Sequence, residues 1–309
     1  MAENRLIVNS SPHMKCIKST SSIMLDVIIA LVPAVILSVY FFSYISAIII
    51  AVSVGTAMLF EYLYNLLAKK KQTVGNLSAV VTGVLLALNL PPVKSSIWIA
   101  VVGTLVAVVI VKMLFGGIGK NIFNPAIAAR VFLTVSFASQ MTDWVAPGVD
   151  GVSAATPLAL AKAGEVTGYL DLLLGNIGGS LGETSAIALL IGGAWLLLRK
   201  VITWHIPVAF IGTVALGAVI FGQDPLFHIL AGGLLLGAIF MATDYVTSPI
   251  TWKGKLIFGF GCGIITIGIR LFGNLPEGVS FSILFMNALV PLIDRYTIPK
   301  SFGEVKKNA

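Results

Sequence analysis

Thr156 is the residue whose position most clearly offers chemistry in this sequence. It directly precedes Pro157, and this pair is typical of a helix N-cap followed by proline at the first helical position. An N-cap hydroxyl lies where free backbone N–H groups and the positive end of the helix dipole converge, so a phosphate attached there would be stabilised. An ordinary capped surface helix explains the same local pattern more simply, and both interpretations stay open at this point.

Three carboxylates, Asp26, Glu61 and Asp244, lie in or beside hydrophobic runs. Acidic side chains at membrane depth are costly, and they line ion paths or pair with bases. We therefore treat these three acids as candidates for an ion path. Asp26 and Glu61 lie near the ends of their runs, where we expect water to reach them. Asp244 comes shortly before Lys253 and Lys255, so an interfacial acid or a turn cap explains it at least as well.

Polar residues also surround a glycine-rich break that spans residues 116–119. Asn121 and Asn124 could present amides to a cofactor, although simple capping explains them equally well. Arg130 follows in a short apolar run. It could contact a cofactor, but a structural pairing with an acid is the favoured interpretation.

Other kinds of chemistry are not supported by the residues. Cys16 and Cys262 lie in a polar tail and an apolar run, and the three histidines are scattered singly, so we predict no protein-ligated metal site. The chain has no cysteine cluster for iron–sulfur ligation and no dinucleotide-binding fingerprint. By itself it should not oxidise NADH.

The elements that position these residues are predicted to lie in a membrane. Of the 309 residues, 57% are hydrophobic and 11% are charged, whereas soluble domains carry roughly 25% charged residues. The mean hydropathy of +0.98 agrees with this. The net charge of +7 comes from basic residues in short connections, which indicates membrane topology and not a nucleic-acid partner. We predict an all-α polytopic membrane protein.

Hydropathy predicts about ten transmembrane helices, several of them shorter than the ~20 residues that a straight span needs. The predicted spans are 23–43, 45–68, 77–90, 96–115, 125–138, 184–198, 205–222, 226–242, 256–272 and 280–294. Short spans bounded by glycine and proline indicate half-helices, which are tolerated where protein covers them or where they line a polar cavity. The expected parts are a cytoplasmic segment 1–22, membrane halves 23–138 and 184–294, a loop 139–183 and a tail 295–309.

The basic residues predict the orientation. They concentrate in the segments that are inside when both termini are cytoplasmic, and the loop 139–183 is then extracytoplasmic. A faint internal repeat relates residues 75–80, before the third span, to residues 182–187, before the sixth. On this topology the two segments start on opposite sides of the membrane, as two inverted five-helix halves would require.

Several motifs resemble the NqrB/RnfD family of subunits of ion-translocating electron-transport complexes. That family has a Ser-Gly-Ala-Thr-type motif, and Ser153-Ala154-Ala155-Thr156 is similar to it, with Ala154 in place of the usual glycine and Asp150 upstream. The resemblance extends over nearly the whole chain and is closer to the shorter, Rnf-type members. Its further segments are 11–13, 117–132, 182–185, 242–249, where Tyr245 replaces a common proline, and 287–294.

The resemblance implies a fold and a function. The family fold is ten helices in two inverted halves, related to the urea-transporter architecture. The motif threonine, here Thr156, would be esterified to FMN through the flavin's phosphate, with Asp150, Ser153 and Ala155 beside it. Some relatives also hold a noncovalent riboflavin, which no sequence pattern locates here.

The implied setting is the cytoplasmic membrane of a prokaryote. The partners would be the RnfA, RnfB, RnfC, RnfE and RnfG subunits, and the complex would couple electron transfer between ferredoxin and NAD to movement of Na⁺ or H⁺. Two other classes stay open: a small-solute transporter or channel of the same fold without a redox cofactor, and a scaffold that carries no cofactor. An adduct at Thr156 would favour the flavoprotein subunit, and an unmodified Thr156 would favour one of the other two classes.

Overall fold

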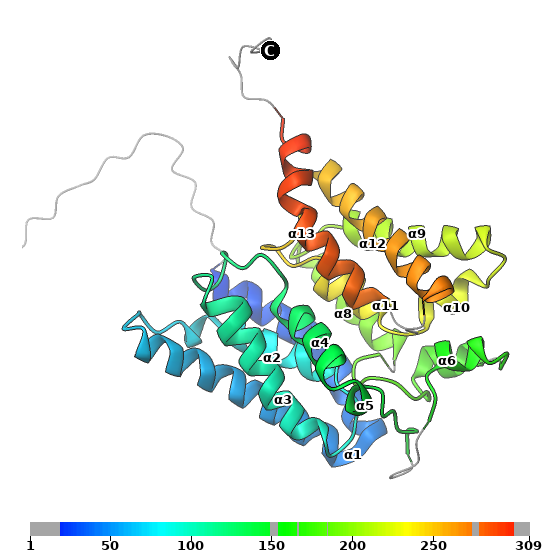
Figure 1. Cartoon of the computed structure of the whole chain (residues 1–309), viewed down its shortest axis with the longest axis horizontal. Coiled ribbons are helices and arrows are strands. Elements are labelled where there is room, and N and C mark those ends of the chain that lie inside the picture. Colours follow the sequence, from blue (N-terminus) through cyan, green and yellow to red (C-terminus); the bar gives the residue numbers. More distant parts are fainter. Residues whose placement is uncertain (1–18, 149–153, 166, 184, 274–277, 300–309) are drawn as a thin grey trace, which may run out of the picture.

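The chain folds into a bundle of helices (Figure 1). The computed structural model describes residues 19–148, 154–165, 167–183, 185–273 and 278–299, and these residues form no β-strand. The segments before residue 125 are α1 (Thr20–Leu67), η1 (Val74–Asn76), α2 (Ser78–Leu88), α3 (Ser96–Thr104) and the π-helical η2 (Leu105–Met113). The next are α4 (Pro125–Ser136), α5 (Ala138–Met141), α6 (Pro157–Lys162) and α7 (Tyr169–Leu174). The remaining ones are α8 (Ala186–Leu198), α9 (His205–Ile220), α10 (Pro225–Leu230), α11 (Leu234–Leu236), the π-helical η3 (Gly237–Met241), α12 (Trp252–Phe272) and α13 (Val279–Thr297).

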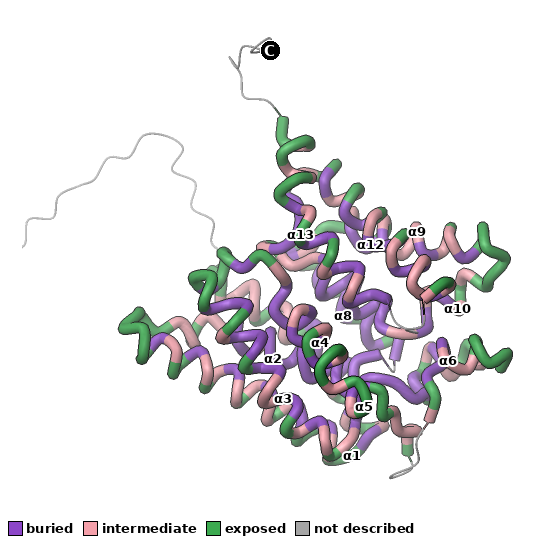
Figure 2. Tube along the Cα trace, in the orientation of Figure 1, coloured by how far each residue is buried: buried purple, intermediate pink, exposed green. Residues whose placement is uncertain are grey.

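Four of the described helical stretches are long and apolar enough to cross a membrane: α1, Ser96–Met113, α12 and α13. Four more, α2, α4, α8 and α9, are apolar but shorter. Buried residues gather on the short helices at the centre, and nearly all of α2 is buried (Figure 2).

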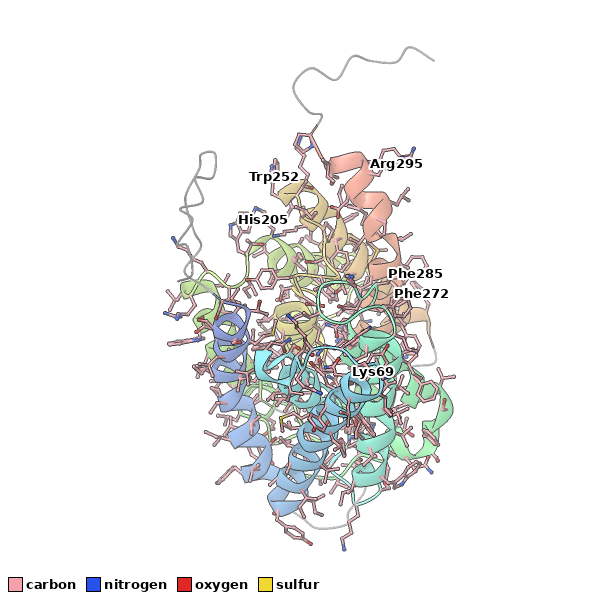
Figure 3. All side chains as sticks on the ribbon, turned by 90° about the vertical axis from the view of Figure 1, so that its left-hand side faces the viewer. Lys69, His205, Trp252, Phe272, Phe285 and Arg295 are labelled. Carbon is pink, nitrogen blue, oxygen red and sulfur yellow. The ribbon has the colours of Figure 1, made fainter. Side chains whose placement is uncertain are left out.

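The outside of the bundle is apolar as well. The rings of Phe272 and Phe285 lie on its surface and are 74% and 57% exposed (Figure 3). Helices that are apolar on both their buried and their exposed faces are typical of a membrane environment. The chain is therefore a multi-pass membrane protein.

The structure breaks the helix at one predicted boundary between spans and inside one predicted span, each time with a local physical cause. The runs 23–43 and 45–68 are joined in α1, but Ser43 has a φ of 59° and a non-helical backbone, so the chain changes direction there. The run 226–242 was predicted as one span, but its helix is interrupted. The helix stops after α10, because Gly232 has a φ of 68°, and resumes as α11 and η3.

Close helix contacts predict a mutational effect at Gly192 in α8. A Cβ at this position would lie 2.1 Å from the carbonyl oxygen of Ala30 in α1, an atom that cannot move without shifting the backbone. We expect Gly192→Ala to destabilise the fold by about 1–3 kcal/mol or more through overpacking. Thermal unfolding of the purified protein in detergent measures the effect.

The matched control is Gly212→Ala in α9, where a Cβ would meet nothing within 4 Å. Alanine is the better helix former, by about 1 kcal/mol, so this variant should be as stable as the wild type or slightly more so. Equal melting temperatures for the two variants would contradict the close α1–α8 contact.

Candidate functional site

Thr156 caps the short helix α6. Its backbone is extended (φ −69°, ψ 153°), its hydroxyl oxygen accepts a hydrogen bond from the backbone N–H of Ala159 at 3.4 Å, and Pro157 is the first helical residue. The predicted N-cap is confirmed. Thr156 is only 3% exposed, whereas Ala155 beside it is exposed. Asp150 and Ser153, the other predicted residues of this motif, lie outside the described residues.

A small hollow lies beside Thr156. Its volume is about 10 Å³, and its wall includes Ile177, Gly178, Glu183 and Gly232. A second cavity, of about 510 Å³, shares Leu158 with it and extends along α6 to α7 and α10.

The rim of this larger cavity carries a hydrogen-bonded pair. The hydroxyl of Tyr169 donates to the carboxylate of exposed Asp224, which lowers the pKa of Asp224 and raises the pKa of Tyr169. Asp224 also caps α10 by accepting from the N–H of Leu226. This edge of the cavity is therefore anionic at neutral pH.

A buried ion pair joins α4 to the segment before α8. The guanidinium of Arg130 lies 2.9 Å from the carboxylate of Glu183, both side chains are less than a tenth exposed, and Arg130 also donates to the amide oxygen of Asn89. The same segment is anchored to the end of α2, because the N–H of Gly182 donates to the carbonyl oxygen of Leu88. The favoured interpretation of Arg130, a structural pairing with an acid, is confirmed.

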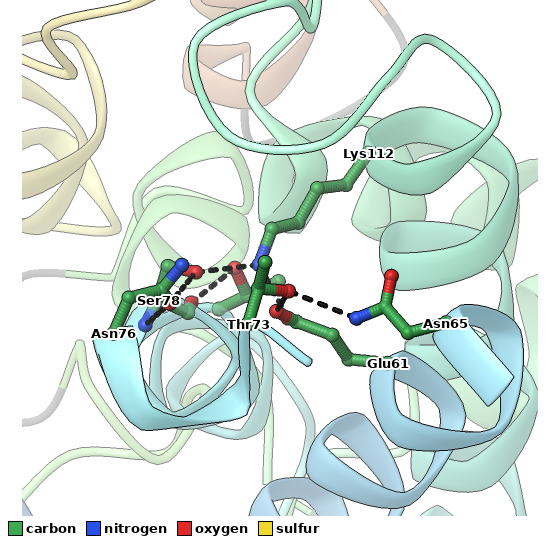
Figure 4. A network of polar contacts seen from close by, with 7 residues as sticks. Glu61, Asn65, Thr73, Asn76, Ser78 and Lys112 are labelled. Carbon is green, nitrogen blue, oxygen red and sulfur yellow. Dashed lines mark hydrogen bonds and ion pairs between the residues drawn. The ribbon is translucent and has the colours of Figure 1, made fainter. Parts of the chain in front are cut away.

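A second buried pair joins α1 to η2 (Figure 4). The ammonium of Lys112 lies 2.7 Å from the carboxylate of Glu61 and donates at 2.7 Å to the hydroxyl of Ser78. Glu61 is 0% exposed and Lys112 is 3% exposed. Such a pair is stable only where hydrogen bonds compensate the loss of hydration of both ions.

Three neighbours supply these hydrogen bonds (Figure 4). Thr73 donates to the other oxygen of Glu61 at 2.5 Å, and the amide of Asn65 donates to Thr73. Asn76 accepts from both the N–H and the hydroxyl of Ser78. The pair is therefore the centre of a continuous polar network inside an apolar bundle.

Lys112 and Ser78 also line the inner cavity, a space of about 390 Å³ between α1, α2, α8 and η3. Its wall is mainly apolar, from residues such as Ile23, Val27 and Phe240. The polar side chains in the wall come from Thr20, Ser78, Thr82, Lys112, Asn121, Asn124, Thr243, Asp244 and Tyr245. Three residues singled out from the sequence, Asn121, Asn124 and Asp244, thus meet in one place.

A sequence profile described as the NQR2, RnfD, RnfE family matches residues 7–303. The chain belongs to this family. It is 49% identical over 317 residues to a subunit of the Na⁺-translocating ferredoxin:NAD⁺ oxidoreductase complex of Acetobacterium woodii, covering 100% of this chain and 99% of that protein.

Two further relatives in the family are similar over almost their full lengths. Identity is 44% to the corresponding subunit of the proton-translocating ferredoxin:NAD⁺ oxidoreductase complex of Clostridium ljungdahlii, with 97% of each chain covered. Identity is 37% to that of the ion-translocating oxidoreductase complex of Escherichia coli O81, covering 97% of this chain and 99% of that one. The names of the first two relatives specify different cations, so family membership does not determine the cation.

In this member of the family, two sequence-based expectations about the acids need correction. Water was expected to reach Asp26 and Glu61, but Glu61 is fully buried with Lys112 and Asp26 is only 4% exposed. Asp26 instead pairs at 3.1 Å with Arg199, whose side chain is half exposed. The reason is that hydropathy places a residue along a span but does not reveal which face of the helix it occupies.

The hydrogen bonds of Asn124, Asn121 and Asp244 agree with their interpretation as local capping residues. The amide oxygen of Asn124 accepts from the N–H groups of Ala126 and Ile127 at the start of α4, and its amide nitrogen donates to the carbonyl oxygen of Met241. Asn121 donates to the carbonyl oxygen of Phe123. Asp244 accepts from the hydroxyl of Thr247 in a turn, as a turn cap would.

Lys112 was missed by the sequence interpretation, which considered three acids and Arg130 in the apolar runs but not this lysine. The available signal was a lysine near the end of the apolar run 96–115 together with Glu61 in the earlier run 45–68. A basic and an acidic residue in two different spans are candidates for pairing. Nothing local to either residue shows that they meet.

Proposed function

We propose that this chain is the membrane flavoprotein subunit of an ion-translocating ferredoxin:NAD⁺ oxidoreductase complex, with FMN esterified to Thr156. The complex couples electron transfer between ferredoxin and NAD to the movement of Na⁺ or H⁺, and the subunit is inactive alone. The observation that carries the proposal is a threonine of the family's motif at the start of α6, in a chain that aligns end to end with relatives named as subunits of such complexes.

The surroundings of Thr156 fit a phosphate ester better than they fit a whole flavin. The N–H of Ala159 already points at the hydroxyl, and it would serve a phosphate oxygen equally well. The hollow of about 10 Å³ is too small for a three-ring isoalloxazine. The flavin therefore extends away from the hydroxyl, past exposed Ala155, where a neighbouring subunit can approach it.

The inner cavity is our proposed site for the noncovalent riboflavin. Its volume of about 390 Å³ and its largely apolar wall suit a planar ring system. The amide side chains of Asn121 and Asn124 supply hydrogen-bonding groups to it. When bound, a flavin contributes one- and two-electron redox chemistry, and the protein contributes position and electrostatics.

For the membrane layout we propose ten helices in two inverted halves, with the urea-transporter arrangement. The break of α1 at Ser43, the extension of α3 by η2, and the interrupted path from α10 to η3 support this count. Each half then contains two of the four shorter apolar helices, α2 and α4 in the first and α8 and α9 in the second.

We also propose that both termini are cytoplasmic and that α6 is extracytoplasmic. Lys162 at the end of α6 donates to the carbonyl oxygen of Gly273, close to the start of α13. The 19 residues of α13 extend roughly 28 Å at 1.5 Å per residue. The far end of α13 therefore lies about one membrane thickness away from α6, as this orientation requires.

The proposed partners are the RnfA, RnfB, RnfC, RnfE and RnfG subunits. The covalent flavin faces an extracytoplasmic redox partner, and the inner cavity, whose wall includes Thr20 at the start of α1, lies toward the cytoplasmic end of the bundle in this orientation. Exposed Ala155 marks the surface next to the flavin. The chain would thus form one section of an electron route through the complex.

Mass spectrometry of natively matured protein tests the assignment directly. Trypsin releases residues 131–162 as one peptide, because no lysine or arginine lies between Arg130 and Lys162. We expect this peptide to carry the mass of FMN less one water, located on Thr156 by fragmentation. An unmodified peptide, from a host that makes the flavin transferase, would instead favour the cofactor-free transporter or the scaffold.

A further inference from the structure

Lys112 contacts both the inner cavity and the carboxylate of Glu61. An ammonium group has three N–H donors. Two of them are used, by Glu61 and by Ser78, each at 2.7 Å. The third has no acceptor among the residues that the structure describes, and Lys112 forms part of the wall of the cavity.

The position of this ammonium is also suited to a free monovalent cation. It lies among oxygen atoms, with the carboxylate of Glu61 and the hydroxyl of Ser78 in direct contact. Oxygen ligands of this kind are the ones that hard cations prefer. The ammonium of Lys112 therefore occupies a position that could bind a transported cation, and it blocks that position while it is bound to Glu61.

The network around the pair is rigid on the side of Glu61 and open on the side of Lys112. Thr73 and Asn65 fix the carboxylate, and Glu61 itself is fully buried (Figure 4). Lysine carries its charge on a flexible four-carbon stem, whereas the carboxylate of Glu61 is also bonded to Thr73, so the ammonium is the freer of the two groups to move. The only other charged side chain in the described wall of the cavity is Asp244.

We propose that Lys112 is a tethered counter-ion that couples negative charge in the inner cavity to cation binding at Glu61. One electron that enters the cavity draws the ammonium toward it and away from the carboxylate. A buried carboxylate without a partner is costly, so Glu61 then takes up one Na⁺ or one H⁺. When the electron leaves, the ammonium returns and displaces the cation. This inference rests on the proposed function, because it needs a redox cofactor in the cavity.

The charges balance in each direction. One negative charge arrives with the electron and one positive charge arrives with the cation, so the net charge of the cavity and the pair does not change. No covalent bond forms or breaks, except that of the proton when H⁺ is the cation. Ferredoxin or NADH supplies the electron in the proposed reaction.

Lys112→Met in the complete complex, reconstituted in vesicles, tests this coupling. We expect electron transfer to continue while the number of cations moved per electron falls about tenfold, a usual size for a coupling between two sites. Lys255→Met is the matched control, since Lys255 donates to the hydroxyl of Thr203 near the surface and has no ion-pair partner among the described residues. The control should keep the wild-type ratio.

A second readout separates coupling from a merely structural role. In redox-induced infrared difference spectra, the wild type should show a change in the carboxylate band of Glu61, identified by its loss in Glu61→Gln. This change should be missing in Lys112→Met. A wild-type spectrum in that variant, or an unchanged cation ratio, would overturn the proposal.

If Lys112→Met does not assemble, the double variant Glu61→Gln/Lys112→Met replaces it. Both new side chains are neutral and close in volume to the originals, so no uncompensated charge stays in the bundle. A double variant with the wild-type cation ratio would also overturn the proposal. Failure of the proposed function looks different, because the wild-type chain itself would then carry no flavin.

Discussion

Replacing Thr156 by alanine is expected to remove all covalent flavin from this chain and to reduce ferredoxin-dependent NAD⁺ reduction by the complex to background. Alanine has no hydroxyl to carry the phosphoester, and the electron route loses one of its cofactors. Flavin fluorescence of the denatured protein in a gel measures the first effect, and a ferredoxin:NAD⁺ assay on the purified complex measures the second.

Thr251→Ala is the matched control for this variant. Thr251 caps α12 as Thr156 caps α6, and its hydroxyl accepts from the N–H of Gly254 at 3.0 Å. Both variants lose an N-cap, at a cost of about 1 kcal/mol, but only one loses the proposed acceptor. The Thr251→Ala band should therefore remain fluorescent. If the Thr156→Ala band is also fluorescent, the flavin is attached to a residue other than Thr156, and the proposed attachment site is wrong.

The second large effect is expected at the buried pair between Arg130 and Glu183. Arg130→Met should destabilise the chain by about 3–5 kcal/mol, because it leaves the carboxylate of Glu183 buried without its cation. The damage should extend to the end of α2, where Gly182 next to Glu183 is anchored to Leu88. Thermal unfolding and the yield of assembled complex measure the loss.

The double variant Arg130→Met/Glu183→Gln provides the comparison. It removes both charges, and replacing a whole buried pair by neutral groups of similar volume is often nearly neutral for stability. We expect it to be more stable than Arg130→Met alone. If the double variant is the less stable of the two, the pair is not the main contribution of Arg130, and its bond to Asn89 becomes the better explanation.

The features of this protein that depend on residues adjacent in the sequence could be predicted from the sequence. The N-caps at Thr156 and Asn124 follow from a polar residue before proline, and both are present in the structure. The apolar runs predicted a membrane protein, because a chain with so few charges cannot cover itself with polar surface. The same kind of signal was available for the break after α10, in Gly232 and Gly233, but the hydropathy of the run 226–242 concealed it.

Only the tertiary structure decided which residues meet. Glu61 and Lys112 are 51 positions apart, Arg130 and Glu183 are 53 apart, and in each pair both partners lie in buried positions. Contacts at such separations depend on how helices cross. Hydropathy shows only which segments are apolar and where along a segment each residue lies. The inner cavity arises in the same way, since α1, α2, α8 and η3 each contribute part of its wall. The sequence thus determined that the chain is a membrane protein and which segments are apolar, while the packing of distant helices determined where its buried charges are placed.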